Sequence, residues 1–89
     1  MSIDLQLFAE KSLKTQTPNF LRKGIRSLEK HIEKHRAKIE NPKEFYPNWD
    51  LLDEREKIGN MRHWNKEILA AEESIKNRIK ELESRGEKL

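Results

Sequence analysis

The three histidines are the residues in this chain with the clearest potential for chemistry. His31 and His35 stand four residues apart, which is a workable spacing for two metal ligands on a helix. A third ligand must come from elsewhere, and His63 is the only other histidine. However, no HExxH motif is present, and His35 lies on the apolar seam described below whereas His31 lies beside it, so we expect their side chains to point differently. We therefore predict no metal site and no cofactor.

Catalysis has less support than metal binding. No set of Ser, His and acidic residues typical of nucleophilic catalysis stands out from the many charges, and the three glycines are too far apart to form a phosphate-binding loop. The alternative is a histidine-based nuclease that uses His63 with Arg62 and Lys66. We predict no catalytic residues and conclude that the chain is not an enzyme.

Basic residues gather in one segment of the chain. Residues 17–40 contain seven Lys/Arg and three Glu, a balance of +4 within a total net charge of +3. Such a face is able to contact phosphates. Glu29 and Glu33 interrupt it, as is usual for the solvated flank of a coiled coil, so nucleic-acid binding is possible but not favoured. The candidate residues are Arg22, Lys23, Arg26, Lys30 and Lys34.

Aromatic residues cluster between the basic segment and the second half of the chain. Phe45, Tyr46 and Trp49 lie close together, and Trp64 follows. Aromatic side chains are enriched at the energetic centres of protein interfaces. The alternative is that they cover the chain's own small core, which we favour for Trp64 and leave open for Tyr46 and Trp49. We predict that Phe45, Tyr46 and Trp49 bind a protein partner.

Composition limits the chain to one small domain. It has 89 residues, of which 34% are hydrophobic and 39% charged, so its apolar residues must form narrow stripes or be covered by a partner. The absence of cysteine excludes disulfides and a cysteine nucleophile, and suits a reducing compartment. No apolar run is long enough to span a membrane, and the start of the chain lacks the basic segment of a secretion signal.

The first residues alternate between apolar and polar side chains. Ile3, Leu5 and Leu7 fall on one side of an extended chain, and Phe8 follows. This period of two is typical of a strand, which has no partner strand here and is able to add to the sheet edge of another protein. We predict that residues 1–16 form an extended arm and linker, with Ile3, Leu5, Leu7 and Phe8 as partner-binding residues.

Two long helices are expected after the arm. Thr17-Pro18 is a favourable helix start, and Asn41-Pro42 a helix stop, which predicts a helix over 17–41. Its seam repeats every three or four residues: Leu21, Ile25, Leu28, Ile32, His35 and Ile39. A second helix is predicted over 54–86, capped by Asp50 or Asp53. Its seam is Ile58, Met61, Trp64, Ile68, Ala71, Ile75, Ile79 and Leu82.

The predicted fold is all-α. A connector over 42–53 is short enough to join the two helices into an antiparallel, coiled-coil-like hairpin over residues 17–89, with an ordered aromatic loop. In this register we expect three neighbouring pairs of seam residues: Ile39 with Met61, Ile32 with Ile68, and Ile25 with Ile75. Because a two-helix seam leaves some apolar residues half covered, we also expect self-association, for example as a four-helix bundle.

The opening Ile3-Asp4-Leu5-Gln6-Leu7-Phe8-Ala9-Glu10 resembles the "LQLFA" opening of capsid, scaffolding and other head-region proteins of tailed phages of low-GC Gram-positive bacteria. Two later stretches, Lys23 to Lys30 and Arg62 to Ile68, resemble a small helical module of phage and prophage proteins of the same group. The resemblance implies a phage or prophage origin and a place in the host cytoplasm or the virion. It brings no catalytic residues with it.

Three functions are compatible with these observations. The first is a small virion or head-assembly component that acts through protein–protein contacts. The second is an accessory protein that binds a bacterial host or defence protein and inhibits or triggers it. The third is a nucleic-acid-binding helical protein. We expect the first, with a protein partner, homo-oligomer formation and no membrane association.

Overall fold

The computed structural model describes residues 13–88, and these residues form an all-helical fold. The elements are a 3-10 turn η1 (Leu13–Thr15), helix α2 (Pro18–Glu40), a short helix α3 (Pro42–Phe45), a 3-10 turn η2 (Trp49–Leu51) and helix α4 (Glu54–Ser84). No strand occurs among residues 13–88, so the all-α prediction is confirmed. The predicted strand and partner-binding residues of the arm, Ile3, Leu5, Leu7 and Phe8, lie outside the described residues.

Local sequence signals set both ends of α2. The Thr17 side chain accepts a hydrogen bond from the Phe20 backbone N–H at 3.2 Å, and Pro18 occupies the first turn, which confirms the predicted cap. At the other end, the Asn41 N–H donates to the Ala37 carbonyl at 2.9 Å, and Pro42 prevents continuation. Pro42 instead begins α3, so the connector consists largely of short helical turns.

Helix α4 begins at an acidic cap and ends at a glycine. The Asp53 side chain accepts from the Glu56 N–H at 2.8 Å. At the end, the Gly86 N–H donates to the Glu83 carbonyl and the Glu87 N–H to the Leu82 carbonyl, both at 3.0 Å. This is the Schellman arrangement, in which Gly86 has a φ of 74°. The helix therefore ends at Ser84, two residues before the predicted end at 86.

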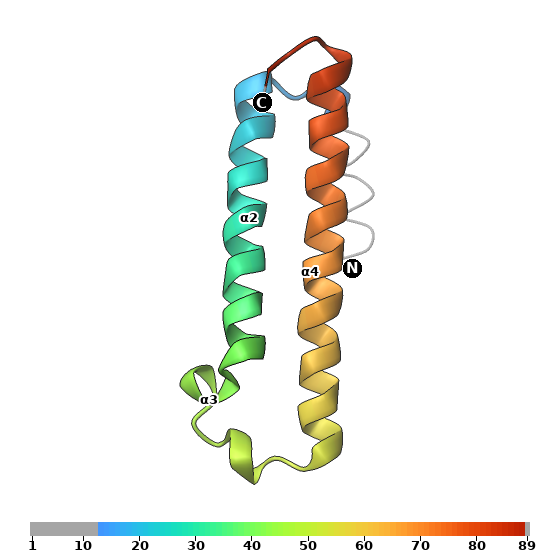
Figure 1. Ribbon diagram of the computed structural model, residues 1–89. Helices are drawn as coiled ribbons and strands as arrows, with labels where there is room; N and C mark the ends of the chain where they lie inside the picture. The colour runs from blue at the N-terminus through green and yellow to red at the C-terminus, as the bar shows by residue number, and fades with distance from the viewer. Residues whose placement is uncertain (1–12, 89) are drawn as a thin grey trace.

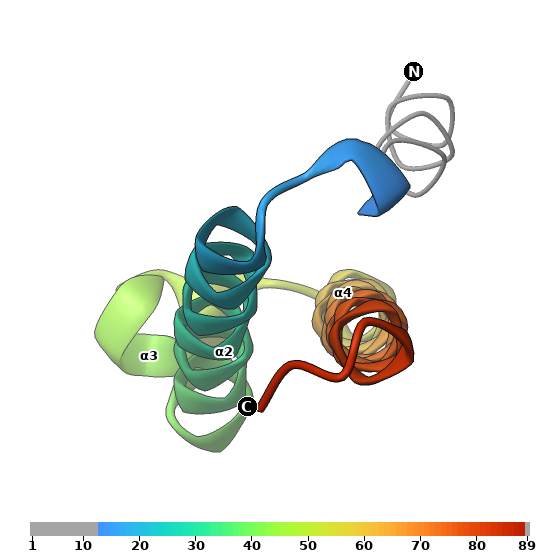
Figure 2. The ribbon, with the colours of Figure 1, turned by 90° about the horizontal axis from the view of Figure 1, so that it is seen from above.

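Helices α2 and α4 lie side by side and run in opposite directions (Figure 1), and seen from above they form two separate columns with α3 on the outer side of α2 (Figure 2). The described chain measures 51 × 25 × 14 Å, so it has one thin layer of buried residues between the helices. None of the described helices has a stretch of the length and apolarity that a membrane span needs.

The buried layer is divided into two clusters. Near the middle, Ile32 packs with Ile68 and Ala71, so the predicted neighbours Ile32 and Ile68 share a cluster. Toward the chain ends, Leu21 packs with Leu82 and Leu13. Ile25 joins this second cluster whereas Ile75 joins the first. The seam of α4 mixes steps of three and four residues without a constant heptad phase, so the pairing shifts along the helices.

Residues 13–16, which we expected to be part of a linker, fold against the end of α4. Leu13 is buried with Leu21 and Leu82. The Arg85 guanidinium donates to the carbonyl oxygens of Gln16 at 2.6 Å, Leu13 at 2.8 Å and Lys14 at 3.1 Å. The physical reason is that α4 is longer than α2, so that its last turns reach η1. There Leu82 packs on Leu13, and the Arg85 guanidinium, which has five N–H donors, binds the backbone carbonyls.

Candidate functional site

Three aromatic side chains stack where the connector meets α4. The Trp64 ring lies 5.7 Å from the Tyr46 ring and 5.7 Å from the Trp49 ring, with interplanar angles of 25° in both cases. Trp64 is 2% exposed and Trp49 is 7% exposed. Such offset stacks stabilise beyond the area they bury. Trp64 and Trp49 thus cover the chain's own core, the alternative that the sequence left open for Trp49.

The same end of the molecule exposes several large apolar side chains. Phe45 is 40% exposed and Tyr46 is 41% exposed, while Leu51 and Ile58 are 83% and 47% exposed. We call these four residues, which lie at the end of α3, just after it, in η2 and in the first turns of α4, the apolar end. Phe20 and Leu69 are also exposed but lie elsewhere on α2 and α4. The apolar end therefore holds the largest group of such residues among residues 13–88.

An ion pair crosses the connector beside the apolar end. Lys43 Nζ of α3 lies 2.9 Å from Asp50 Oδ2 of η2. Both side chains are more than half exposed, so the pair itself adds little stability. The position of Tyr46 depends mainly on the buried Trp64, on which its ring stacks.

The predicted basic residues do not form one free surface. Arg22 contacts Glu87 at 3.0 Å, the Lys88 carbonyl at 2.8 Å and Asn19 at 3.3 Å, so it ties α2 to the end of the chain. The side chains of the remaining residues are exposed and make no hydrogen bond or ion pair with other residues of the described part of the chain: Lys23, Arg26, Lys30 and Lys34. Exposed Glu29 and Glu33 lie between them in sequence.

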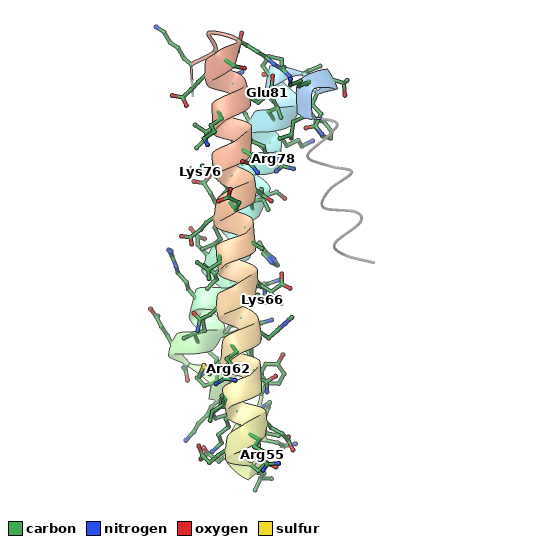
Figure 3. The ribbon with its side chains drawn as sticks, turned by 90° about the vertical axis from the view of Figure 1, so that its right-hand side faces the viewer. Arg55, Arg62, Lys66, Lys76, Arg78 and Glu81 are labelled. Carbon is green, nitrogen blue, oxygen red and sulfur yellow. The ribbon has the colours of Figure 1, made fainter. Side chains whose placement is uncertain are left out.

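The residues considered for a nuclease lie on the outer surface of α4. Arg62, His63 and Lys66 are all exposed, and Figure 3 shows Arg62 and Lys66 on the side of α4 that faces the viewer. His63 contacts Glu67, with Nε2 3.9 Å from Oε1. An exposed helix surface does not enclose a substrate or exclude water, so this arrangement offers no support for catalysis.

Histidines and a carboxylate meet at the middle of the helix pair. The His31 and His35 rings are 4.3 Å apart at 80°, edge to face. Glu67 of α4 faces them, with Oε2 3.6 Å from His31 Nε2. One possible ligand atom from each of His31, His35 and Glu67 lies within 4.8 Å of the other two. We refer to these three residues as the histidine–glutamate cluster.

The expectation that His31 and His35 point differently is wrong. Residues four apart on an α-helix are rotated by only about 40° and lie one turn above each other, so a seam residue and its neighbour still share a face. The sequence also named His63 as the third residue, whereas the structure places Glu67 beside His31, with Oε2 3.6 Å from Nε2. The predicted pairing of Ile32 with Ile68 was the signal for Glu67, because in an antiparallel pair it leaves His31 and Glu67 only about 3 Å apart along the helix axis.

His35 is the buried member of the cluster. It is 8% exposed, and its Nδ1 atom has no hydrogen-bond partner among the described residues. Burial lowers the pKa of His35 below 6.5, and the nearby His31 and Lys38 lower it further, against an opposing effect of Glu67. His35 is therefore neutral at pH 7 and retains a lone pair on one ring nitrogen.

Comparison with known proteins found no match for this chain. No protein-family model matches the sequence, and no curated protein or solved structure matches it either. The functional argument therefore depends on the residues and contacts of this chain alone.

Proposed function

We propose that this chain is a protein–protein interaction module, in which an antiparallel hairpin of α2 and α4 presents an ordered aromatic loop to a partner. The observation that supports this most directly is the apolar end. Phe45, Tyr46, Leu51 and Ile58 are large apolar side chains left substantially exposed on a connector that buried tryptophans hold in place. Exposed apolar groups of this kind are typical of contact surfaces.

The proposed biological setting is a tailed phage or prophage. It is supported by the resemblance of residues 3–10 to the opening of head-region proteins and of two helical stretches to a small helical module of phage and prophage proteins, as described above. Within that setting we favour a small virion or head-assembly component, located in the host cytoplasm before assembly and in the virion afterwards.

Self-association is part of the same proposal. The chain buries only eight hydrophobic residues among those described, and Phe20 and Leu69 stay exposed on the long helices. A second copy that packs against this helix pair as a four-helix bundle buries them. Light scattering is expected to show a dimer, and a purely monomeric folded protein at high concentration would contradict this part.

The test is a pull-down with tagged protein from cells infected by the phage that carries the gene. Double substitution F45S/L51S removes apolar surface from the apolar end without touching buried residues. The comparison variant F20S/L69S removes a Phe and a Leu that are 60% and 67% exposed on the long helices, and so tests the self-association surface separately. The proposal expects particle proteins with the wild type, their loss in F45S/L51S with the dimer retained, and a loss of the dimer by light scattering in F20S/L69S.

The alternative function, binding to a host or defence protein, gives a different result in the same experiment. A stable complex with a single host protein, with no chain in purified particles, would replace the virion assignment. If F45S/L51S captures the same proteins as the wild type, the apolar end is not the contact surface.

Nucleic-acid binding stays as a second candidate because Lys23, Arg26, Lys30 and Lys34 have no ionic partner among the described residues. It predicts affinity that falls steeply with salt, roughly in proportion to the number of phosphates contacted. A charge-neutralising double variant, K30Q/K34Q, is expected to reduce that salt dependence. If DNA or RNA binding is absent at low salt, this candidate is excluded.

A further inference from the structure

We propose that His31, His35 and Glu67 bind a divalent transition-metal ion, with Zn²⁺ as the representative ion, and that the bound ion links α2 to α4. This site is independent of the apolar end, because no residue of the apolar end takes part in it. It depends on three residues that come from two helices and meet on one side of the helix pair.

The donor atoms are those that such an ion prefers. Two imidazoles and one carboxylate form a frequent three-residue set for Zn²⁺, and they also suit Cu²⁺ and Ni²⁺. Ca²⁺ and Mg²⁺ prefer oxygen ligands in larger numbers, and Glu67 is the only carboxylate of the cluster. The chemistry thus selects a late first-row transition ion over an alkaline-earth ion.

The distances are close to those of a metal site. Bonds of about 2.1 Å in a tetrahedron place ligand atoms roughly 3.4 Å apart. His31 Nε2 and Glu67 Oε2 are already 3.6 Å apart, and all three possible ligand atoms lie within 4.8 Å of one another. Since His31 and Glu67 are partly exposed, small rotations of their side chains bring the three atoms to binding distance.

His35 supplies an independent observation. A buried ring nitrogen without a hydrogen-bond partner is unusual, because burial of an unsatisfied polar atom costs stability. The His35 side chain is more than nine-tenths buried, and its Nδ1 has no hydrogen-bond partner among the described residues. One His35 nitrogen is free to ligate an ion, and the other then takes the proton of the neutral ring.

An entry path and a fourth ligand are also available. An open groove lined by Leu28, His31, Glu67 and Ala70 connects two of the three residues of the cluster with solvent. His63 Nε2 lies 3.9 Å from the other oxygen of Glu67, and the His63 side chain is mostly exposed. Either a water molecule or His63 is therefore able to complete four-coordination.

The consequence is a clamp across the thin core. His31 and His35 belong to α2 and Glu67 to α4, beside the central Ile32–Ile68 cluster. An ion that binds the folded chain and not the unfolded one stabilises the fold by mass action. At an ion concentration a hundredfold above the dissociation constant, the melting temperature of a chain of this size rises by roughly 10 °C or more.

The test uses the full chain without a histidine tag, after treatment with EDTA and dialysis. Calorimetric titration with ZnCl₂ is expected to show one ion per chain, and Co²⁺ is expected to give the visible absorption of a tetrahedral site. The variants H31A and E67Q each remove one ligand from a partly exposed position, and are expected to weaken binding at least tenfold. Both ligands are exposed enough for the variants to fold.

The matched control is E72Q. Glu72 is also a half-exposed carboxylate of α4 that contacts α2, through Arg36 at 3.5 Å, but it is not in the cluster. E72Q is expected to bind Zn²⁺ as the wild type does. Absence of heat and of any thermal shift overturns the proposal, and so does binding that H31A and E67Q leave unchanged, because the ion then binds elsewhere. A zinc-dependent increase in mass by light scattering contradicts a clamp within one chain.

Discussion

Replacement of Trp64 by alanine is expected to remove much of the stability of the fold. Trp64 is almost completely buried and stacks on both Tyr46 and Trp49. A large-to-small change at such a position costs about 3–5 kcal/mol, and each aromatic stack contributes roughly 0.5–1.5 kcal/mol beyond the buried area. A whole domain is typically stable by only about 5–15 kcal/mol. Trp64→Ala therefore brings this chain close to unfolding.

Urea unfolding followed by far-ultraviolet circular dichroism measures this change, and the fluorescence of Trp49, the other tryptophan of the chain, reports on the connector. Trp64→Phe retains an aromatic ring and is expected to lose roughly half as much stability, so it gives a value even if the alanine variant does not fold. Glu73→Ala, at an exposed site on the same helix, is the control and should change stability by at most about 0.5 kcal/mol. A loss below about 1 kcal/mol in Trp64→Ala would refute the assignment of Trp64 to the core.

Three further changes test other contacts. Gly86→Ala is expected to cost about 1 kcal/mol of stability, because Gly86 has a φ of 74°. Gly59→Ala, in open space on α4, should instead stabilise the fold by about the same amount. Thermal melts of the two variants compare these effects. Arg85→Met removes the donors to three carbonyls of residues 13–16 and should cost about 1–3 kcal/mol, with faster amide hydrogen exchange at η1. For His35 the folded pKa is below the unfolded value of 6.5, so the unfolded state binds more protons. The free energy of unfolding therefore decreases as the pH falls from about 6.5 through the folded pKa. Unfolding of the wild type and of His35→Leu in EDTA should show this decrease in the wild type only.

Much of the fold follows from local sequence signals. Thr17-Pro18 and Asn41-Pro42 bound α2 because they act on backbone hydrogen bonds and φ/ψ angles within one turn. The apolar periodicity predicts which faces of α2 and α4 are buried, and Ile32 and Ile68 meet accordingly. The connector was harder to predict. Proline at position 42 stops one helix and also starts the next short one, and the same residue type signals both.

The contacts that join distant parts of the chain could not be predicted in the same way. Leu13 lies in a polar segment, and only the length of α4 determines that it meets Leu82. Glu67 is one of many glutamates, and it joins His31 and His35 only because of the helix register. The phase shift of the α4 seam makes this register change along the pair, and a change of one or two residues separates those side chains. Whether charged residues of two paired helices meet in one cluster thus depends on the register of the helices rather than on the spacing of those residues in the sequence.

The thin core also links stability to the proposed binding surface. Tyr46 stacks on Trp64, which in turn stacks on Trp49, and both tryptophans are among the few large buried side chains. A partner that covers the apolar end must therefore stabilise the same stack that the fold depends on. Loss of Trp64 should then abolish partner binding by unfolding the connector, whereas F45S/L51S should abolish it with the fold intact. Because an ion at the histidine–glutamate cluster acts on the middle of the helix pair, it should raise stability in F45S/L51S as much as in the wild type.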